Sequence, residues 1–465
     1  MKYAHYDYCI VGAGPAGLTL AYKLLEAQKR VLLIERDDRV GGLSKSFDHD
    51  GHVFDTGPKR FHSDDPVVLS FIDEIMPMET IGRSTKVFFL NKYYTWPLAS
   101  TEMYKLPIPI AVKSLLDLLQ KREIADRRSF HEYITYQYGD TLYSTFFKPY
   151  TEKFLRWDPE DIHSDWASTG INRSVIDKRV KANSLVSLLA SIALPKKVQT
   201  EFLYPRTGGF GAFFDRLLDL CTESENFDLL LGNTLSSLED HGSKFDASTK
   251  DGRSLSFDSL VWAGNINDLC RLISPIEYDL HYLNTIFYYV ICENEGVGKV
   301  RAQWIYISKG DGLVSRITCM KEFSPRNCPE GYYNFICEVT DSQLKPIYFR
   351  DPSAYQDGVI GELEGMSFLK HARHIEAIHI NPVVDTYPIY HKRYLTDFGQ
   401  VTKTIKQFAK RIHLLGRSGA FWYNNSDHSI RMALDMSRKL LVDPEEEFDY
   451  RGYFGGNSQE DKEHE

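Results

Sequence analysis

The chain has 465 residues, of which 43% are hydrophobic and 26% are charged, and its formal charge is −9 at pH 7. This length is too great for one ordinary hydrophobic core, so we expect at least two domains that share a cleft. The negative charge argues against a nucleic-acid partner, which usually leaves a basic surface. An anionic ligand would therefore be bound by a few arginines inside a pocket.

Cysteine usage and hydropathy bear on the cellular compartment. The seven cysteines are odd in number and show no C-x-x-C spacing, which predicts free thiols in a reducing compartment. No run approaches the roughly 18 apolar residues of a membrane span, and the N-terminus has no signal-peptide pattern. We therefore predict a cytoplasmic protein without a membrane span, and we assign no metal site.

The first forty residues predict a βαβ unit. Residues 6–11 form a short buried strand, residues 18–25 have helical periodicity, and residues 31–35 are a second apolar run. A strand, a glycine turn, a helix and a second strand in this order indicate a parallel sheet.

The turn in this unit carries the spacing G-x-G-x-x-G, with Gly12, Gly14 and Gly17. The first glycine permits a tight turn, the second lets the backbone approach a pyrophosphate, and the third allows helix and strand to pack closely. The helix N-terminus then presents N–H groups and a partial positive charge to the pyrophosphate. Glu35 ends the second strand, where an acid accepts a hydrogen bond from a ribose hydroxyl. The segment predicts a dinucleotide site.

The later elements suggest a second domain inserted into the first. Residues 108–193 have a helical pattern, residues 229–262 resemble a β-meander, and residues 278–339 are rich in strands. A helix is expected at 401–410, followed by a strand at 411–415. We predict an α/β (α+β overall) fold with a Rossmann-type FAD-binding domain that includes a β-meander, and with inserted helical and antiparallel-sheet substrate regions. The predicted ranges are 1–97, 200–272 and 385–442 for the FAD-binding domain, 98–199 for the helical region, 273–384 for the sheet, and 443–465 for an acidic flexible tail.

A second glycine pair follows the acid and favours FAD over NAD. Residues 36–44 contain the run Val-Gly-Gly-Leu-Ser, where the backbone would lie close beside the cofactor. This resembles the extended fingerprint of the FAD-containing amine oxidase and protoporphyrinogen oxidase superfamily. A plain surface turn at Gly41 and Gly42 is the alternative.

Further stretches resemble one branch of that superfamily, the UDP-galactopyranose mutases and mutase-like flavoproteins. The resemblance extends to about residue 441. The stretches that carry it are 54–64, 146–153, 204–211, 261–264, 314–317 with 323–325, 387–388, 416–423 and 425–429.

The cofactor contacts follow from the motif and the resemblance. Arg417 is an always-charged guanidinium suited to neutralising a pyrophosphate. A helix predicted at 430–441 would direct its positive N-terminus at the flavin. The alternative is that Asp427 only caps that helix. The predicted cofactor residues are Gly12, Gly14, Ala16, Gly17, Glu35, Arg36, Gly42, Leu43, Lys59, Arg60, Phe61, Gly416, Arg417, Asn425, Asp427 and Ser429.

The substrate contacts rest mainly on the resemblance. It implies that Arg173 and Arg316 clamp a nucleotide diphosphate, because two guanidiniums in a dry pocket make bidentate contacts and disperse leaving-group charge. Without the resemblance, an ordinary surface salt bridge is the favoured interpretation of either arginine. His62 is placed beside the flavin as a catalytic candidate, with an ordinary loop histidine as the alternative. The other predicted substrate residues are Phe146, Tyr150, Thr151, Leu155, Tyr387 and Tyr423.

Four of the predicted site residues have an alternative role or depart from the family pattern. Phe146, like Tyr150, would stack on a nucleobase or simply pack in the core. Leu155 stands where many mutases have a tryptophan, and Lys59 stands where a histidine is usual. Both departures concern the sugar end of the site, so the sugar need not be galactose.

The resemblance implies a mutase that interconverts pyranose and furanose forms of a nucleotide-diphosphate sugar, through a covalent bond between N5 of reduced FAD and the sugar. NAD(P)H or another reductant would keep the flavin reduced, and a homodimer is compatible with the family. A role in polysaccharide biosynthesis would follow. The alternatives are an oxidase or dehydrogenase of the amine oxidase type, with an apolar tunnel, and an escort protein of the same fold that uses no flavin.

Overall fold

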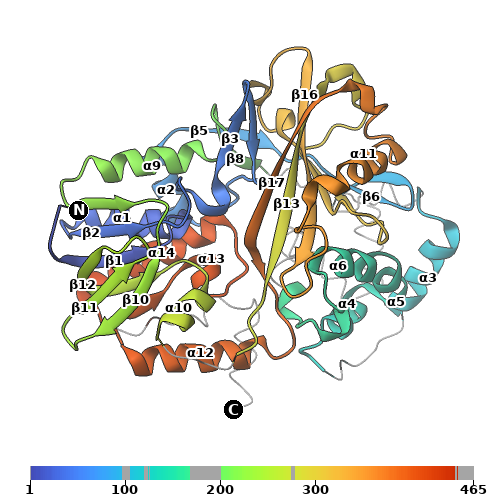
Figure 1. The fold of residues 1–465 in the computed structure, drawn as a ribbon. Coiled ribbons are helices and arrows are strands. Elements are labelled where there is room, and N and C mark those ends of the chain that lie inside the picture. Colours follow the sequence, from blue (N-terminus) through green and yellow to red (C-terminus); the bar gives the residue numbers. More distant parts are fainter. Residues whose placement is uncertain are drawn as a thin grey trace.

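The computed structural model describes residues 2–96, 105–119, 124, 126–167, 201–273, 278–445 and 448. Two seven-stranded sheets form its framework. Figure 1 shows the first sheet at the left with its helices, the long strands of the second sheet at the centre, and a group of helices at the lower right. The predicted fold class is confirmed.

The first sheet has the order β10-β11-β12-β1-β2-β9, and β18 also pairs with β12. β1 is parallel to β2 and β12, while β10, β11 and β12 form an antiparallel meander. Both the βαβ unit and the meander are therefore present, as predicted. The strands are β1 (Tyr6–Val11), β2 (Val31–Ile34), β9 (Phe227–Leu230), β10 (Leu235–Asp240), β11 (Phe245–Thr249), β12 (Ser254–Trp262) and β18 (Ile412–Leu414).

Helices cover this sheet, and α1 contacts both α9 and α14. The helix expected at 401–410 is α12, which begins seven residues earlier. Tyr394, Phe398, Val401 and Ile405 are buried at helical spacing, so the apolar face of α12 extends further toward the N-terminus than predicted. The helices are α1 (Pro15–Glu26), α2 (Pro66–Ile75), α9 (Ala212–Thr222), α10 (Ile266–Ile273), α12 (Tyr394–Phe408), α13 (Gly416–Gly419) and α14 (Ser426–Val442).

The second sheet has the order β17-β13-β16-β15-β14-β6-β7. β13 lies between β16 and β17, and all but its last residue are buried. β6 and β7 belong to this sheet although they fall within the range 1–97, so the pairing favours a domain boundary before Thr85. The strands are β6 (Thr85–Phe89), β7 (Lys92–Thr95), β13 (Tyr282–Glu293), β14 (Trp304–Ile307), β15 (Arg316–Cys319), β16 (Tyr332–Ser342) and β17 (Ile375–Pro388).

Two short antiparallel pairs complete the strand pairing among the described residues. β3 (Ser46–His49) pairs with β4 (His52–Asp55), and β5 (Met78–Gly82) pairs with β8 (Glu201–Pro205). The hairpin of β3 and β4 contacts the second sheet, where Phe54 stacks on Tyr289 with ring centroids 4.9 Å apart.

In the helical region beside the second sheet, residues 130–147 do not form one continuous helix. Gly139 has a φ of +84° and ends α4, and its N–H donates to the carbonyl of Thr135. The chain continues through a π-helical turn, Tyr143–Phe147, which leads into α6. The helices are α3 (Ile108–Leu119), α4 (Phe130–Tyr138), α5 (Asp140–Leu142), α6 (Lys148–Leu155) and, on the second sheet, α11 (Gln356–Gly365).

Three other expectations can be compared with the structure. The seven cysteines are all buried and unpaired, as predicted. Within the described ranges, no helix combines the length and the apolar composition that crossing a bilayer requires. Most of the predicted acidic tail lies outside the described residues. Its first residues contact the rest of the protein. His413 Nε2 donates to the Pro444 carbonyl at 2.9 Å, and Phe448 is buried beneath Lys439.

Candidate active site

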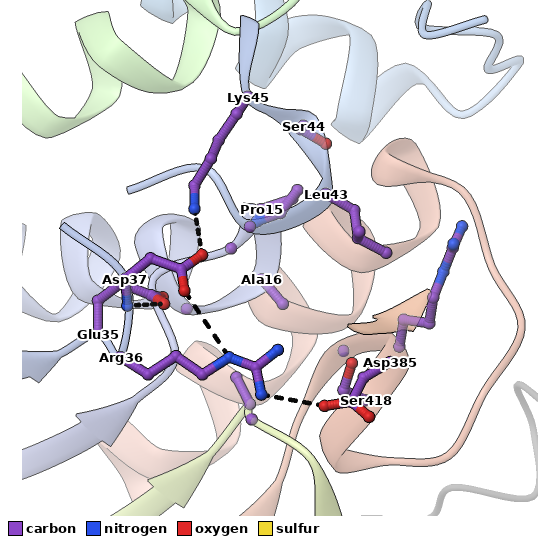
Figure 2. Close-up of a pocket in the computed structure, with 18 of the residues that line it drawn as sticks. Pro15, Ala16, Glu35, Arg36, Asp37, Leu43, Ser44, Lys45, Asp385 and Ser418 are labelled. Carbon is purple, nitrogen blue, oxygen red and sulfur yellow. Dashed lines mark hydrogen bonds and ion pairs between the residues drawn. The ribbon is translucent and has the colours of Figure 1, made fainter. Parts of the chain in front are cut away.

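A cavity of about 540 Å³ lies where the carboxyl ends of β1, β2 and β12 meet β17 and the first turns of α13 and α14. This is the edge of a parallel sheet at which α/β proteins bind ligands, and the volume is typical of a ligand site. The predicted cofactor residues that line it are Gly12, Gly14, Ala16, Gly17, Glu35, Arg36, Gly42, Leu43, Lys59, Gly416, Arg417, Asn425 and Ser429. Figure 2 shows part of this wall.

The three motif glycines have different environments. Gly12 has a φ of +104°, and a Cβ there would lie 2.9 Å from the backbone of Ala263. A Cβ on Gly17 would lie 2.0 Å from the carbonyl oxygen of Gly12, so only glycine lets α1 pack so closely on β1. A Cβ on Gly14 would have no neighbour closer than 3.9 Å, and Gly14 lines the cavity. Gly14 therefore leaves room for a ligand, whereas the other two shape the turn.

The first turn of α1 is suited to an anion. Gly14 is its N-cap, and no side chain caps the helix. Residues Pro15, Ala16 and Gly17 line the cavity, so the uncapped end of the helix faces it. Uncapped N–H groups and the positive end of a helix dipole together bind phosphate groups.

Glu35 is buried at the end of β2 and lines the cavity beside the glycine turn. Its Oε2 accepts from the Ala13 N–H at 2.7 Å, and its Oε1 accepts from the Asp37 N–H at 3.1 Å. A carboxylate has about four acceptor positions, so two remain for a ligand hydroxyl. Glu35 thus shapes the turn and still fits the predicted ribose contact.

The cations at the outer part of the cavity are neutralised within the protein. Arg36 Nη1 lies 3.0 Å from Asp385 Oδ2, and Lys45 forms a close ion pair with Asp37, as Figure 2 shows. Arg39 pairs in the same way with Asp215 at 2.9 Å.

Two other cations of the wall have no such pairing. Arg417 donates to the carbonyls of Thr386, at 3.0 Å, and Asn424, and it has no carboxylate partner among the described residues. The backbone N–H of Lys59 donates to the Gly57 carbonyl at 2.8 Å, but the ammonium group makes no hydrogen bond with a described residue. Burial and the neighbouring Arg417 and Arg316 together lower the pKa of Lys59 to about 7. The cavity therefore offers two uncompensated cations to an anionic ligand.

The N-terminus of α14 also lines the cavity. The helix begins at Ser426, four residues before the predicted start, and its N-cap Asn425 makes no side-chain capping bond. Asn425, Ser426 and Ser429 face the cavity, so a second uncapped helix end adjoins it. Asp427 does not line the cavity, and no capping bond to its side chain is found, so its role remains a prediction.

Arg60 and Phe61 also do not line this cavity. Phe61 is buried in the core, with its ring centroid 4.6 Å from that of Phe210. Its backbone pairs with Leu203 in both directions at 3.0 Å. Phe61 thus anchors the loop that carries Lys59.

The predicted substrate residue Arg316 is the centre of a buried cluster. It forms a bidentate pair with Glu338, with Nε 2.7 Å from Oε1 and Nη2 2.6 Å from Oε2. Nη2 also donates to the hydroxyl of Tyr387 at 3.1 Å, and the rings of Tyr387 and Tyr423 are 5.4 Å apart. Glu338 holds the pKa of Arg316 well above its usual range, so the guanidinium stays charged despite burial. We name Arg316, Glu338, Tyr387 and Tyr423 the Arg316 cluster.

Arg417 joins the cavity to this cluster. Its guanidinium carbon lies 5.2 Å from the ring centroid of Tyr387 and 5.4 Å from that of Tyr423. The same side chain lines the cavity. A ligand group next to Arg417 is therefore also next to the Arg316 cluster.

The remaining predicted substrate residues lie on α6 and the turn before it. Phe146 packs among aromatic rings, 5.3 Å from Phe89 and 5.5 Å from Trp96, and this arrangement fits core packing better than base stacking. Tyr150 lies 6.0 Å from Tyr306, and burial raises its pKa well above the usual range. Thr151 and Leu155 are buried. Arg173 lies outside the described residues.

His62 is half-buried in the loop after Lys59, with its ring 5.2 Å from and perpendicular to Phe202. Burial lowers its pKa, and the neighbouring Arg60 lowers it further, so the ring is neutral at pH 7. A neutral imidazole next to Arg60 fits a hydrogen-bonding role better than a cationic one.

Two carboxylates of the site were not predicted from the sequence. Glu338 is fully buried in β16, and a lone glutamate within the apolar strand was a usable signal, because a buried glutamate needs a cationic partner. Asp385 holds Arg36 from a position with a φ of +59°, in a part of β17 where the register with β13 shifts. Nothing local in the sequence indicates that irregularity.

The cavity fits the predicted dinucleotide. It combines an uncapped helix end at a glycine turn, a buried acid at the end of β2 and an uncompensated arginine. Those groups suit a pyrophosphate and a ribose. The residues present would thus hold FAD.

Comparisons with known proteins agree with this fit. A family model described as flavin containing amine oxidoreductase matches residues 15–280, more than half of the chain. Over 162 residues, the chain is 27% identical to the probable UDP-galactopyranose mutase of Klebsiella pneumoniae and to the dTDP-fucopyranose mutase of Escherichia coli. Each alignment covers 33% of this chain and 42% of the relative, so the chain spans less than half the length of the curated relatives it matches.

The structural similarity covers much more of the chain than these sequence alignments. The crystal structure of reduced UDP-galactopyranose mutase superposes with a TM-score of 0.81 at 21% identity, covering 94% of this chain and 96% of the other. The resemblance seen in the sequence is thus confirmed. By the family match, the chain belongs to the flavin containing amine oxidoreductase family and is a flavin-dependent enzyme of the amine oxidase superfamily.

Proposed function

We propose that the protein is a flavin-dependent mutase that interconverts the pyranose and furanose forms of a nucleotide-diphosphate sugar. The observation that carries the proposal is the contact of Arg417 with both the cofactor cavity and the tyrosines of the Arg316 cluster. A diphosphate bound by Arg316 would lie next to the cofactor. The mutases among the relatives support this substrate class.

Reduced FAD, when bound, supplies an electron-rich nitrogen that serves as the nucleophile toward the anomeric carbon. No nucleophilic side chain is then required, and the protein contributes binding and charge. Arg316 would bind the nucleotide diphosphate as it leaves and returns, with its guanidinium held in one orientation by Glu338. Tyr387 and Tyr423 would donate hydrogen bonds to the same phosphates.

The position of Lys59 supports a role beside the reacting centre. Its side chain lines the cavity, and its pKa of about 7 lets it gain or lose a proton near neutral pH. A positive charge there would stabilise an anionic reduced flavin. Lys59 therefore has the position and the pKa of a group that holds the cofactor in its reduced state.

The alternative is an oxidase of the amine oxidase type, which the family match keeps open. Such an enzyme would hold an uncharged substrate in an apolar tunnel. The buried ion pair, the uncompensated cations and the tyrosines of this site favour an anionic substrate instead.

The test is to incubate the flavin-loaded protein with a panel of UDP- and dTDP-sugars, with and without dithionite, and to separate the products by HPLC. A ring isomer of unchanged mass, formed only with reduced flavin, is the expected result. Arg316→Lys should lower kcat/KM about 100-fold, because it loses the bidentate geometry. The matched control is Arg326→Lys, at an exposed pair with Glu79. Oxygen consumption without isomer formation would favour the oxidase.

A further inference from the structure

Arg60 is a partly buried arginine that has no carboxylate partner among the described residues. Its guanidinium carbon lies 4.4 Å from the ring centroid of Trp304 and 5.1 Å from that of Phe202. Nη1 donates to the carbonyl of Pro58 at 2.7 Å, whereas the buried Nε has no hydrogen-bond partner in the described part of the chain. A guanidinium has five N–H donors, so most of its donors are not used by the protein.

Stacking on aromatic rings does not explain why Arg60 has no carboxylate partner. Arg411 is stacked in a similar way, 4.7 Å from the ring centroid of Phe245, but it also pairs with Asp240 at 3.0 Å and donates to two backbone carbonyls. A cation–π contact offsets only part of the cost of holding an unpaired charge away from water. Arg60 therefore lacks the carboxylate partner and the second backbone hydrogen bond that Arg411 has.

The groups around Arg60 leave a surplus of positive charge. Arg316 is close enough to add to the lowering of the Arg60 pKa that burial causes, and Arg60 in turn lowers the pKa of His62. Asp427 is the carboxylate that most favours the charged form of Arg60, but it makes no contact with the guanidinium. Because Glu338 already pairs with Arg316, the charge of Arg60 is not balanced locally.

We propose that Arg60 binds an oxyanion of the substrate on the wall formed by Trp304 and Phe202, beside the Arg316 cluster. The inference rests on the proposed function for the identity of the substrate. Two sources share this chemistry: the diphosphate itself, or a carboxylate carried by the sugar, as in a nucleotide hexuronic acid. Either accepts two parallel hydrogen bonds from a guanidinium.

The experiment compares the flavin-loaded wild type with Arg60→Met and Arg60→Lys. Isothermal titration calorimetry measures the Kd of inorganic pyrophosphate, UDP, a UDP-hexose and a UDP-hexuronic acid. Loss of a charge-assisted hydrogen bond should weaken binding about 10- to 100-fold. If the diphosphate is the source, Arg60→Met weakens all four probes; if a sugar carboxylate is the source, it weakens only the UDP-hexuronic acid. Arg326→Met, at an exposed pair, is the control and should change none of them.

Stability separates a ligand role from a structural one. Removal of an uncompensated charge should leave the thermal midpoint of Arg60→Met unchanged or higher, whereas loss of a structural arginine would lower it. Equal affinity of Arg60→Met and the wild type for all four probes would overturn the inference, as would a wild type that binds none of them. The two proposals fail separately: ring isomerisation with unchanged affinities in Arg60→Met would reject only the role of Arg60, and weakened binding without isomerisation would reject only the mutase.

Discussion

In the cofactor cavity, many of the groups that a ligand would meet are backbone: the glycine turn, the first turn of α1 and the first turn of α14. The Arg316 cluster is built from side chains that come from β15, β16, β17 and the segment before α14. A site formed by backbone groups loses its ligand when a Cβ occupies the space of that ligand. A site formed by charged side chains is disrupted when one of the charges is removed. The two regions should therefore respond to different substitutions.

The largest effect is expected in the glycine turn. Gly17→Ala places a Cβ 2.0 Å from the carbonyl oxygen of Gly12, so α1 must move and the protein should lose both bound flavin and stability. Gly14→Ala is the matched control for folding, because its Cβ has no neighbour closer than 3.9 Å. It should leave the flavin-free protein stable and weaken only flavin binding. The absorbance ratio at 450 and 280 nm and the thermal midpoint measure the two effects. Equal midpoints for the two variants would refute the distinction.

A smaller but substantial effect is expected in the Arg316 cluster. Glu338→Ala leaves Arg316 buried without its partner, which should lower the free energy of unfolding by about 3–5 kcal/mol. Replacing both residues by Met should recover most of this loss, because no charge is then buried unpaired. Urea unfolding of the flavin-free variants measures the difference. Glu79→Ala, at an exposed pair, should change stability by less than about 1 kcal/mol. A double variant as unstable as Glu338→Ala would contradict the explanation by charge.

The smallest effect concerns Lys59, where the two regions meet. Its pKa in the folded protein is about 7, well below its ordinary value near 10.5. Between these two values the unfolded chain binds more protons than the folded one, so the stability of the flavin-free protein should rise with pH in this window. Lys59→Met should reduce that slope, and the exposed Lys403→Met should not. Urea unfolding at several pH values from 7 to 9.5 measures it. Identical slopes in Lys59→Met and the wild type would show that Lys59 is not held in an uncompensated site.

The contrast also explains which parts of the molecule could be predicted. Gly17 is required by Gly12, five residues before it, so local spacing was enough to predict the turn, whereas the contact of Gly12 with Ala263 could not be seen in that spacing. Arg316 was recognised as a charged residue of the site, but its partner Glu338 comes from the next strand of the sheet and could be paired with it only in three dimensions. Arg60 was predicted as a cofactor contact because it belongs to the stretch 54–64, which the resemblance places against the flavin. Adjacent residues of an extended loop point in different directions, and Arg60 instead packs on Trp304, which is 244 positions further along the chain (304 minus 60).

The ion pair of Arg36 and Asp385 has a consequence for how the protein acquires its cofactor in the cell. The two residues are 349 positions apart, and the cavity wall runs from Val11 to Ser429. During synthesis, the glycine turn leaves the ribosome first, but its opposite wall does not exist until almost the whole chain has been translated. Flavin capture is therefore a late event in biogenesis. Until the segment that ends at Ser429 has been made, the glycine turn has no opposite wall against which to hold a flavin.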